Sequence, residues 1–291
     1  MRNGFFPALG TPLDAEGNLN KESYDKQIES MINAGASGLL CMGSMGNMSS
    51  IRDEVYPDVA EACVDAVKGR IPVMVGVMDN SINRVMDRIY ALGDLKIDGV
   101  VATPPFYYKS TDQQIFNFYS GLTAESYYPV YIYDLVAVTQ SPVTEEVFTT
   151  LMKDPDIGGI KTANYDMLQS VINSGKVPEG FEILYSGLDT FDKAQQNGIT
   201  KNLDGMFTST PVNSKKMYEC ASVKDYEGVS KYLKNIVKVR DEYVKSSVFT
   251  AYSYSMNLLG MPGRYQPDFH GRVEGGAMDG IKECLKEIGE L

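Results

Sequence analysis

The sequence predicts an α/β fold in which eight parallel strands and their helices form a (β/α)8 barrel, followed by a helical extension. Short apolar runs alternate with longer amphipathic stretches, and one such pair takes about 30 residues in a parallel sheet. The runs follow one another at intervals of 23 to 35 residues and begin near Phe5, Gly38, Val73, Gly99, Val130, Gly158, Glu182 and Gly205. Eight units of this length close naturally into a TIM barrel of about 250 residues.

Individual segments fit this alternation. Residues 71–77 are almost continuously apolar, as expected for a parallel strand that is covered on both faces. Within residues 23–34, apolar side chains recur at a helical spacing. An open, doubly wound sheet is the alternative architecture. It would usually carry a glycine-rich dinucleotide-binding turn after a strand, and the sequence has none.

The last part of the chain is predicted to be helical. Residues 229–236, 248–259 and 277–285 each carry apolar side chains at helical spacing, and residues 260–263 (Gly-Met-Pro-Gly) break the pattern. No low-complexity linker separates these helices from the barrel. We therefore divide the chain into a barrel over residues 1–222 and a C-terminal helical extension over residues 223–291 that packs on it.

Composition narrows the function classes. The chain of 291 residues has 43% hydrophobic and 22% charged residues, a globular balance, and its net charge of −11 argues against a nucleic acid partner. We expect no membrane partner, because no apolar run reaches the roughly 18 residues of a spanning helix. The four cysteines have no paired spacing, which indicates a reducing cytoplasm. The only histidine, His270, lies in a turn-rich stretch, and we expect no metal site.

Lys161 is the most informative residue of the chain. It is expected to close the apolar run 156–160 as the last residue of a buried strand, where packing does not explain a lysine. Burial favours the neutral form of an amine, and a neutral amine can attack a carbonyl and form a Schiff base. An exposed strand-end lysine or a structural ion pair is the alternative interpretation.

Polar residues gather at the other expected strand ends, where barrel enzymes carry their active sites. Tyr133 precedes Lys161 by one βα unit, so we expect the two on neighbouring strands, where a phenol can move protons for an amine. Gly43 and Gly46 bracket a tight turn whose N–H groups can hold a carboxylate. Singly, these are also typical of a core tyrosine and an ordinary turn. The other polar positions include Thr11, Ser44, Tyr107, Asp134, Thr162, Gly187, Asp189 and Ser209.

Six motifs are specific in combination. They are Phe6-Pro-Ala-Leu-Gly-Thr-Pro12, Gly43-Ser-Met-Gly46, Thr103-Pro-Pro-Phe-Tyr-Tyr108, Tyr133-Asp134, Gly159-Ile-Lys161 and Leu258-Leu-Gly-Met-Pro-Gly263. In this order and spacing the chain resembles, over nearly its whole length, the dihydrodipicolinate synthase and N-acetylneuraminate lyase superfamily of class I, pyruvate-type aldolases.

The resemblance implies a barrel with C-terminal helices, assembled as a homotetramer, that needs no metal or organic cofactor. It implies that Lys161 forms a Schiff base with a 2-oxo acid such as pyruvate and that Tyr133 shuttles protons. Ser44 and the loop around it, Gly43 and Met45 included, would hold the pyruvate carboxylate. Tyr107 matches the tyrosine that completes the proton relay, often across a subunit contact.

The chain departs from the family pattern at several positions. Met45 and Asn47 stand where Thr and Glu are common, and Asp134 replaces the usual Asn. Residues 134–140 lack the arginine with which dihydrodipicolinate synthases bind the second substrate. Asp189 and Ser209 resemble the hydroxyl-binding positions of the sugar-acid lyases, with Gly187, Thr11 and Thr162 expected nearby. Thr190, however, stands where sialic-acid lyases have Glu.

Three functional hypotheses follow. The leading one is a Schiff-base aldolase or lyase that makes or releases pyruvate and acts on a sugar acid, either like an N-acetylneuraminate lyase or like a 2-keto-3-deoxy sugar acid aldolase. The second is a dihydrodipicolinate synthase that joins pyruvate to aspartate semialdehyde with an altered second-substrate site. The third is a non-catalytic barrel that binds a 2-oxo acid.

Overall fold

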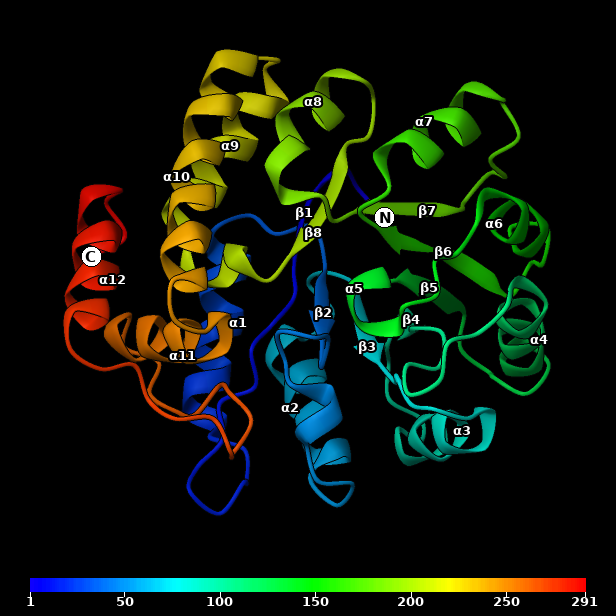
Figure 1. Cartoon of the computed structure of the whole chain (residues 1–291), viewed down its shortest axis with the longest axis horizontal. Helices are drawn as coiled ribbons and strands as arrows, with labels where there is room; N and C mark the ends of the chain where they lie inside the picture. Colours follow the sequence, from blue (N-terminus) through cyan, green and yellow to red (C-terminus); the bar gives the residue numbers. More distant parts are fainter.

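Eight parallel strands form a barrel in the computed structural model, which describes residues 1–291 (Figure 1). From β2 to β8 each strand pairs with the next, and β8 pairs with β1. A bridge between Ala8 and Leu40 brings the end of β1 beside β2, so the ring is complete. The predicted (β/α)8 fold is confirmed. The strands are β1 (Gly4–Pro7), β2 (Leu39–Cys41), β3 (Val73–Gly76), β4 (Gly99–Ala102), β5 (Val130–Asp134), β6 (Ile157–Thr162), β7 (Glu182–Tyr185) and β8 (Lys201–Asp204).

Helices surround this ring (Figure 1). Those that follow the strands are α1 (Lys21–Asn33), α2 (Tyr56–Val67), α3 (Ile82–Ala91), α4 (Asp112–Thr123), α5 (Val136–Thr139), α6 (Glu145–Leu151), α7 (Tyr165–Asn173), α8 (Phe191–Gln196) and α9 (Pro211–Ser222). Short 3-10 helices follow three strand ends: η1 (Met48–Ser50), η2 (Leu188–Thr190) and η3 (Met206–Ser209).

Side-chain caps fix where several helices begin. The Asn20 side chain accepts a hydrogen bond from the Ser23 N–H, and Thr111 and Gln114 form a reciprocal capping box at the start of α4. Such caps satisfy N–H groups that have no partner in the first helical turn. The first helix therefore begins at Lys21, slightly before the predicted start at residue 23.

Two predicted strand positions are wrong. The eighth strand does not begin near Gly205 but spans Lys201–Asp204, where parallel pairing with β1 compensates for a polar sequence. Lys161 is not the last residue of its strand, because β6 continues to Thr162, which still pairs with Asp134 of β5. Both errors arise because apolarity was the only signal for a strand, whereas backbone pairing decides where a strand ends.

An aromatic cluster joins the strands to the outer helices. The Phe5 ring stacks on Tyr218 of α9 at a centroid distance of 5.0 Å and meets Phe207 edge-on at 5.2 Å. Phe191 of α8 lies 5.7 Å from Phe207, so the cluster extends from β1 to the helices that follow β7 and β8. This packing fixes the η3 turn, which carries Ser209, against the barrel.

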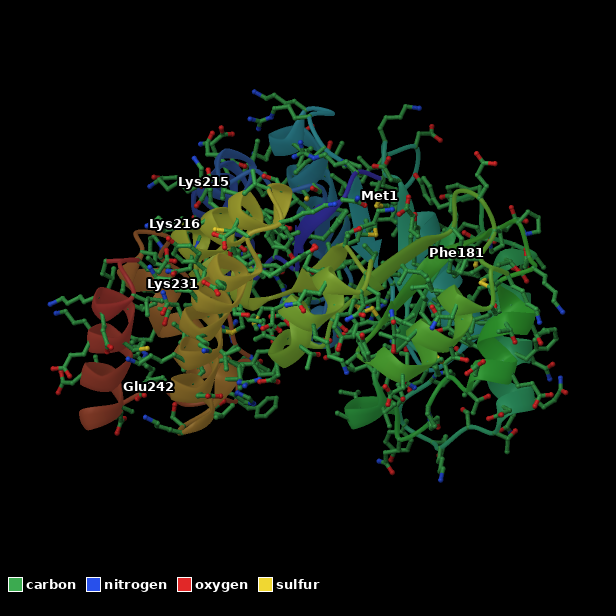
Figure 2. All side chains as sticks on the ribbon, turned by 90° about the horizontal axis from the view of Figure 1, so that it is seen from above. Met1, Phe181, Lys215, Lys216, Lys231 and Glu242 are labelled. Carbon is green, nitrogen blue, oxygen red and sulfur yellow. The ribbon has the colours of Figure 1, made fainter.

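The C-terminal extension consists of α10 (Tyr226–Val244), α11 (Val248–Leu258) and α12 (Gly276–Glu287). The proposed division between residues 222 and 223 falls in the turn between α9 and α10. Helix α10 packs on α9, α11 and α12, and Figure 2 shows these helices stacked on one side of the barrel. None of the helices combines the length and the apolar composition that a membrane-spanning helix requires.

Candidate active site

Lys161 lies inside the barrel next to Tyr133. The two residues pair directly across β5 and β6, and the Lys161 Nζ atom lies 3.4 Å from the centroid of the Tyr133 ring. Only 6% of Lys161 is exposed. An amine over the face of a phenol is held by a cation–π contact, so the ring of Tyr133 orients Lys161 without an ion pair to a carboxylate.

An irregular register between β5 and β6 creates this pairing. Val130 pairs with Ile157, but Tyr131 pairs with Gly159, so Gly158 is an extra residue on β6. The Tyr131 ring fills the space where a Cβ atom of Gly158 would lie, at 2.8 Å, and a side chain there would clash. Because strand side chains alternate between faces, this one-residue shift decides that Lys161 shares a face with Tyr133.

Ser44 completes the inner group. Its hydroxyl lies 3.3 Å from the Tyr133 hydroxyl, and either group can be the donor. Ser44 follows β2, which is separated from β5 by two other strands in the ring, so this hydrogen bond spans the barrel opening. The structure thus brings together Lys161, Tyr133 and Ser44, as the sequence predicts.

The loop that carries Ser44 is held by close contacts. A Cβ atom on Gly43 would approach Leu40 at 2.8 Å, and one on Gly46 would lie 2.8 Å from the Met42 Cα atom, so both glycines permit tight backbone packing. The Thr11 hydroxyl donates to the Gly46 carbonyl at 2.8 Å. Thr11, predicted to bind substrate, therefore lies under the loop and supports it.

Met45 and Asn47 have structural explanations. Met45 packs across the barrel end against Gly205, where a Cβ atom would come within 2.8 Å of the Met45 Cβ atom. Asn47 adopts a left-handed backbone conformation (φ 53°), which asparagine tolerates better than most residues. Its buried amide donates to the Tyr265 carbonyl, so it ties the Ser44 loop to the C-terminal extension.

Asp134 and Thr162 lie on the opposite face of the strands from Lys161. They follow Tyr133 and Lys161 directly, and alternation turns their side chains outward. The Thr162 hydroxyl donates to Asp134 at 2.8 Å, and the Val143 N–H donates to the other oxygen at 3.2 Å. Burial raises the pKa of Asp134, and these two hydrogen bonds only partly oppose it. The structure does not bring this pair to Lys161.

The expected residues of β7 and β8 lie in the turns that follow these strands. Gly187 packs on the Tyr185 hydroxyl, and Ser209, in η3, is buried and donates to the Met206 carbonyl at 3.2 Å. Asp189, in η2, has a side chain that is 63% exposed and is bound by Arg240 of α10. Hydrogen bonds from Arg240 lower the pKa of Asp189, so its carboxylate stays ionised.

Tyr107 is exposed to solvent, unlike the buried side chains of Lys161 and Tyr133. It is 74% exposed on the loop after β4, edge-on to Tyr108 at 4.8 Å. Asn80 fixes this loop, because its side-chain oxygen accepts from the N–H groups of Phe106 and Tyr107 at 2.9 and 2.8 Å. A side chain that is fixed at its backbone and exposed at its ring is available to a second protein chain.

Three residues near the barrel opening are not among the residues predicted from the sequence: Asn80, Asp79 and Arg240. Asn80 and Asp79 follow β3, so the rule that searches strand ends would have found them. The buried Asp79 side chain pairs with Arg84 and Arg88, at 2.8 and 3.0 Å, and anchors the backbone at Asn80. Arg240 gives no such signal, because it lies within a long amphipathic helix.

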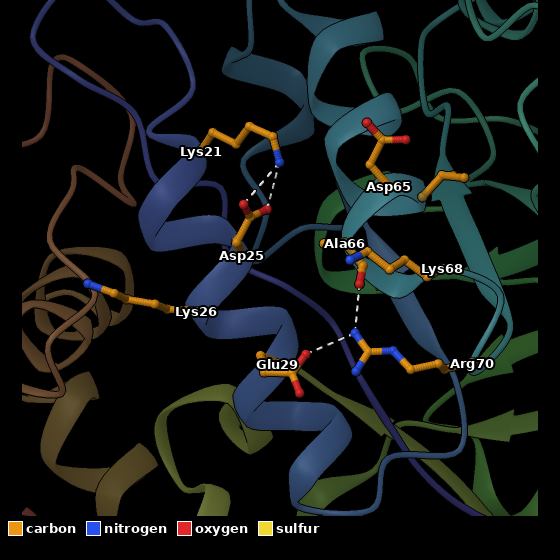
Figure 3. A pocket seen from close by; sticks show the side chains of 9 residues that line it. Lys21, Asp25, Lys26, Glu29, Asp65, Ala66, Lys68 and Arg70 are labelled. Carbon is orange, nitrogen blue, oxygen red and sulfur yellow. Dashed lines mark hydrogen bonds and ion pairs between the residues drawn. The ribbon is translucent and has the colours of Figure 1, made fainter.

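A wide surface groove of about 970 Å³ lies outside the barrel between α1 and α2 (Figure 3). Four of its charged side chains form two ion pairs: Lys21 pairs with Asp25 and Arg70 with Glu29, each at 2.9 Å. Exposed pairs of this kind leave little field for a ligand. The barrel opening is therefore the better candidate for the functional site than this groove.

Comparisons with known proteins show which family the chain resembles. The model of the dihydrodipicolinate synthetase family matches residues 1–268. The 4-hydroxy-tetrahydrodipicolinate synthase of Oleidesulfovibrio alaskensis is 30% identical over 168 residues, 57% of each chain. That of Methanospirillum hungatei is 28% identical over 234 residues, 78% of this chain and 79% of the relative. The chain thus spans little more than half the length of the first of these relatives.

Solved structures share the fold. The dihydrodipicolinate synthase of Thermotoga maritima superposes with a TM-score of 0.91 and 19% identity over the whole of both chains. YagE, a prophage protein of E. coli K12 solved in complex with pyruvate, gives a TM-score of 0.89 and 21% identity over 99% of each chain. At these identities the likeness establishes the barrel and its C-terminal helices.

The buried Asp134 leads to a testable prediction about stability. We expect Asp134→Asn to raise the midpoint of thermal unfolding near neutral pH, because an amide has no charge to desolvate. Its oxygen can accept from the Val143 N–H, and its NH2 group can donate to the Thr162 hydroxyl oxygen. With a pKa raised by burial, ionised Asp134 costs stability above the unfolded-state pKa of about 3.9. The difference in unfolding midpoint between Asp134→Asn and the natural protein should therefore narrow as the pH falls toward that value. Calorimetry at several pH values measures it, with exposed Asp94→Asn as control. A gap that widens in acid would contradict the prediction.

Proposed function

Because the chain belongs to the dihydrodipicolinate synthetase family, we propose that it is a class I aldolase, a carbon–carbon lyase that joins a 2-oxo acid such as pyruvate to Lys161 as a Schiff base. The observation that carries this proposal is the Lys161 amine over the Tyr133 ring, with the Ser44 hydroxyl 3.3 Å from the phenol oxygen. The chemistry needs no metal or organic cofactor, because the protonated imine is itself the electron sink.

The first step is formation of the imine. The neutral amine of Lys161 attacks the ketone carbon, and a proton moves from the nitrogen to the former ketone oxygen to give a neutral carbinolamine. Its hydroxyl then leaves as water after a second protonation, for which Tyr133 is the nearest phenol. The nitrogen ends as a protonated imine. The N–H groups of the Ser44 turn and the Ser44 hydroxyl hold the carboxylate of the 2-oxo acid.

The second step makes or breaks the C–C bond. In cleavage, Tyr133 as phenolate takes the proton of the aldol hydroxyl, an aldehyde leaves, and the bonding electrons move to the imine, which becomes an enamine. Protonation of the enamine carbon and hydrolysis then release pyruvate and restore the Lys161 amine. Condensation runs through the same steps in reverse.

We also propose that the protein works as a homotetramer in which Tyr107 acts across a subunit contact. The exposed ring and the loop fixed by Asn80 support this, because an isolated chain leaves Tyr107 in solvent. In such an assembly Tyr107 would extend the Tyr133–Ser44 pair into a relay that reaches bulk water. The four cysteines are free thiols, which supports a cytoplasmic setting.

For the substrate we propose a sugar acid, either of the N-acetylneuraminate type or a 2-keto-3-deoxy sugar acid. Asp189 and Ser209 lie in the turns after β7 and β8 and supply hydroxyl-binding groups, and Gly187 beside them packs closely on the Tyr185 hydroxyl. The loop that follows Tyr133 has no arginine for a second carboxylate. These features favour a polyhydroxylated chain over a second acidic substrate.

The second candidate is condensation of pyruvate with aspartate semialdehyde. It is favoured by the relatives that are named 4-hydroxy-tetrahydrodipicolinate synthase. In this case the site that receives the semialdehyde carboxylate would differ from the family pattern. A barrel that binds a 2-oxo acid without catalysis is a third candidate, for which an imine-forming pair would have no use.

Borohydride reduction tests the proposed nucleophile. We expect the protein incubated with pyruvate and borohydride to gain the mass of one reduced pyruvate per chain, on a peptide that contains Lys161. Lys161→Ala should remove both the adduct and the activity, whereas the exposed Lys153→Ala should change neither. Absence of an adduct in the natural protein would leave only the non-catalytic barrel.

A substrate panel tests the reaction. We expect cleavage of at least one sugar acid, followed by pyruvate release in a coupled assay, at a kcat/KM of about 10⁴ M⁻¹s⁻¹ or more, as is usual for enzymes. Condensation with aspartate semialdehyde should be at least about tenfold slower, because no arginine of the β5 loop holds its carboxylate. The opposite ranking would overturn the sugar-acid proposal in favour of the second candidate.

Co-expression of two inactive variants tests the role of Tyr107. A Lys161→Ala chain supplies an intact Tyr107, and a Tyr107→Phe chain supplies an intact Lys161. If the tyrosine acts across an isologous contact, about a quarter of all sites regain both groups and the same share of activity. Tyr108→Phe in place of Tyr107→Phe is the control, since it should be active on its own. Activity no higher than that of the Tyr107→Phe protein would contradict the proposal.

A further inference from the structure

Helix α10 brings a guanidinium group to the carboxyl end of the barrel. The helix packs against η2 and η3, the turns that carry Asp189 and Ser209. Arg240, near its C-terminal end, faces η2, and one turn later the buried Tyr243 lies near Ser209. Residues three apart share one face of a helix. The same face of α10 therefore meets both turns that we assign to the distal part of the substrate.

Arg240 holds Asp189 in a fixed orientation. One terminal nitrogen donates to Asp189 Oδ1 at 2.6 Å, the other donates to Oδ2 at 3.0 Å, and the Nε atom donates to Asp241 at 2.7 Å. This two-point contact aligns the planes of the guanidinium and the carboxylate, which a single ammonium group could not do. The Arg240 side chain is only 27% exposed, whereas that of Asp189 is 63% exposed.

The pair leaves Asp189 able to bind a ligand. A carboxylate has about four acceptor positions, and Arg240 occupies one on each oxygen. The remaining positions lie on a largely exposed side chain. They can accept hydrogen bonds from the hydroxyl groups of a ligand.

Arg240 also shapes the charge at this end of the barrel. Burial raises the pKa of Asp204, at the end of β8, and the positive charges of Lys161 and Arg240 both oppose this rise. Arg240 thus belongs to the same electrostatic neighbourhood as the proposed nucleophile. It offsets the negative charge of Asp189, which would otherwise repel an anionic 2-oxo acid from the opening.

From these contacts we propose that Arg240 is a positioning residue that sets substrate specificity, by orienting Asp189 to accept hydrogen bonds from the hydroxyl groups of the aldehyde half of the substrate. The inference rests on the proposed aldolase function. The test distinguishes this role from two others: a purely structural contact that holds α10 on the barrel, and direct binding of a substrate carboxylate.

The test compares aldehydes in the condensation with pyruvate. Glyceraldehyde carries two hydroxyl groups and propanal carries none, so the ratio of their kcat/KM values isolates the contribution of hydroxyl binding. We expect Arg240→Gln to lower this ratio about tenfold or more, the usual effect of losing a hydrogen bond to a charged group. Arg240→Lys should recover little of it, because an ammonium group makes no two-point contact.

Lys238→Gln is the matched control. It removes another ion pair of α10, with Glu287 of α12 at 2.5 Å, on a side of the helix that does not face η2. This variant should leave the ratio unchanged. Asp189→Asn should lower the ratio as Arg240→Gln does, and the double variant should be no worse than Asp189→Asn alone, since the two side chains act as one unit.

Each other outcome has a defined meaning. Reduced thermal stability of Arg240→Gln with an unchanged ratio of the two kcat/KM values would show that the pair has a structural role only, and would overturn the proposal. So would equal losses with both aldehydes, additive losses in the double variant, or a natural protein that does not prefer glyceraldehyde. A loss confined to aspartate semialdehyde would show direct carboxylate binding instead. Borohydride trapping of pyruvate on Lys161, run on every variant, reports failure of the proposed function separately.

Discussion

The extra residue at Gly158 is the constraint on which the candidate site depends. It shifts the pairing of β6 against β5 by one position, and because side chains alternate along a strand, it brings Lys161 to the same face as Tyr133. The shift is held by packing, since the Tyr131 ring occupies the space that a Cβ atom at residue 158 would need. Without it, Lys161 would pair with Asp134, and the amine would lose its place over the phenol.

The C-terminal extension contributes to the barrel opening and is more than an outer layer. Asn47 of the Ser44 loop donates a hydrogen bond to the Tyr265 carbonyl. The Asp189 carboxylate of η2 accepts hydrogen bonds from both terminal nitrogens of Arg240. These two contacts reach opposite parts of the opening: the turn assigned to the pyruvate carboxylate and the turn assigned to the distal hydroxyl groups. A helical segment that follows the barrel in sequence therefore fixes loops that lie far earlier in the chain.

Three of the departures from the family pattern, at Met45, Asn47 and Asp134, have physical explanations in the structure. Asn47 suits a left-handed backbone position and makes a buried hydrogen bond, and Met45 fills the space above Gly205. Asp134 lies on the helix-facing side of β5, where Thr162 and the Val143 N–H surround its carboxylate. It therefore adds a buried charge behind the site, not in front of Lys161. None of the three departures removes a group from the Lys161, Tyr133 and Ser44 cluster.

The sequence by itself determined the eight βα units, the C-terminal helices and the trio of Lys161, Tyr133 and Ser44. Apolar periodicity and the spacing of strand ends are local properties, and parallel strands carry their ends to one side of the barrel. Only the tertiary structure decided which face Asp134 and Thr162 take, that Thr11 supports a loop, and that Arg240 pairs with Asp189. These depend on a register shift and on contacts between residues far apart in the chain, such as the 51 positions between Asp189 and Arg240. No local pattern of residues encodes contacts of that kind.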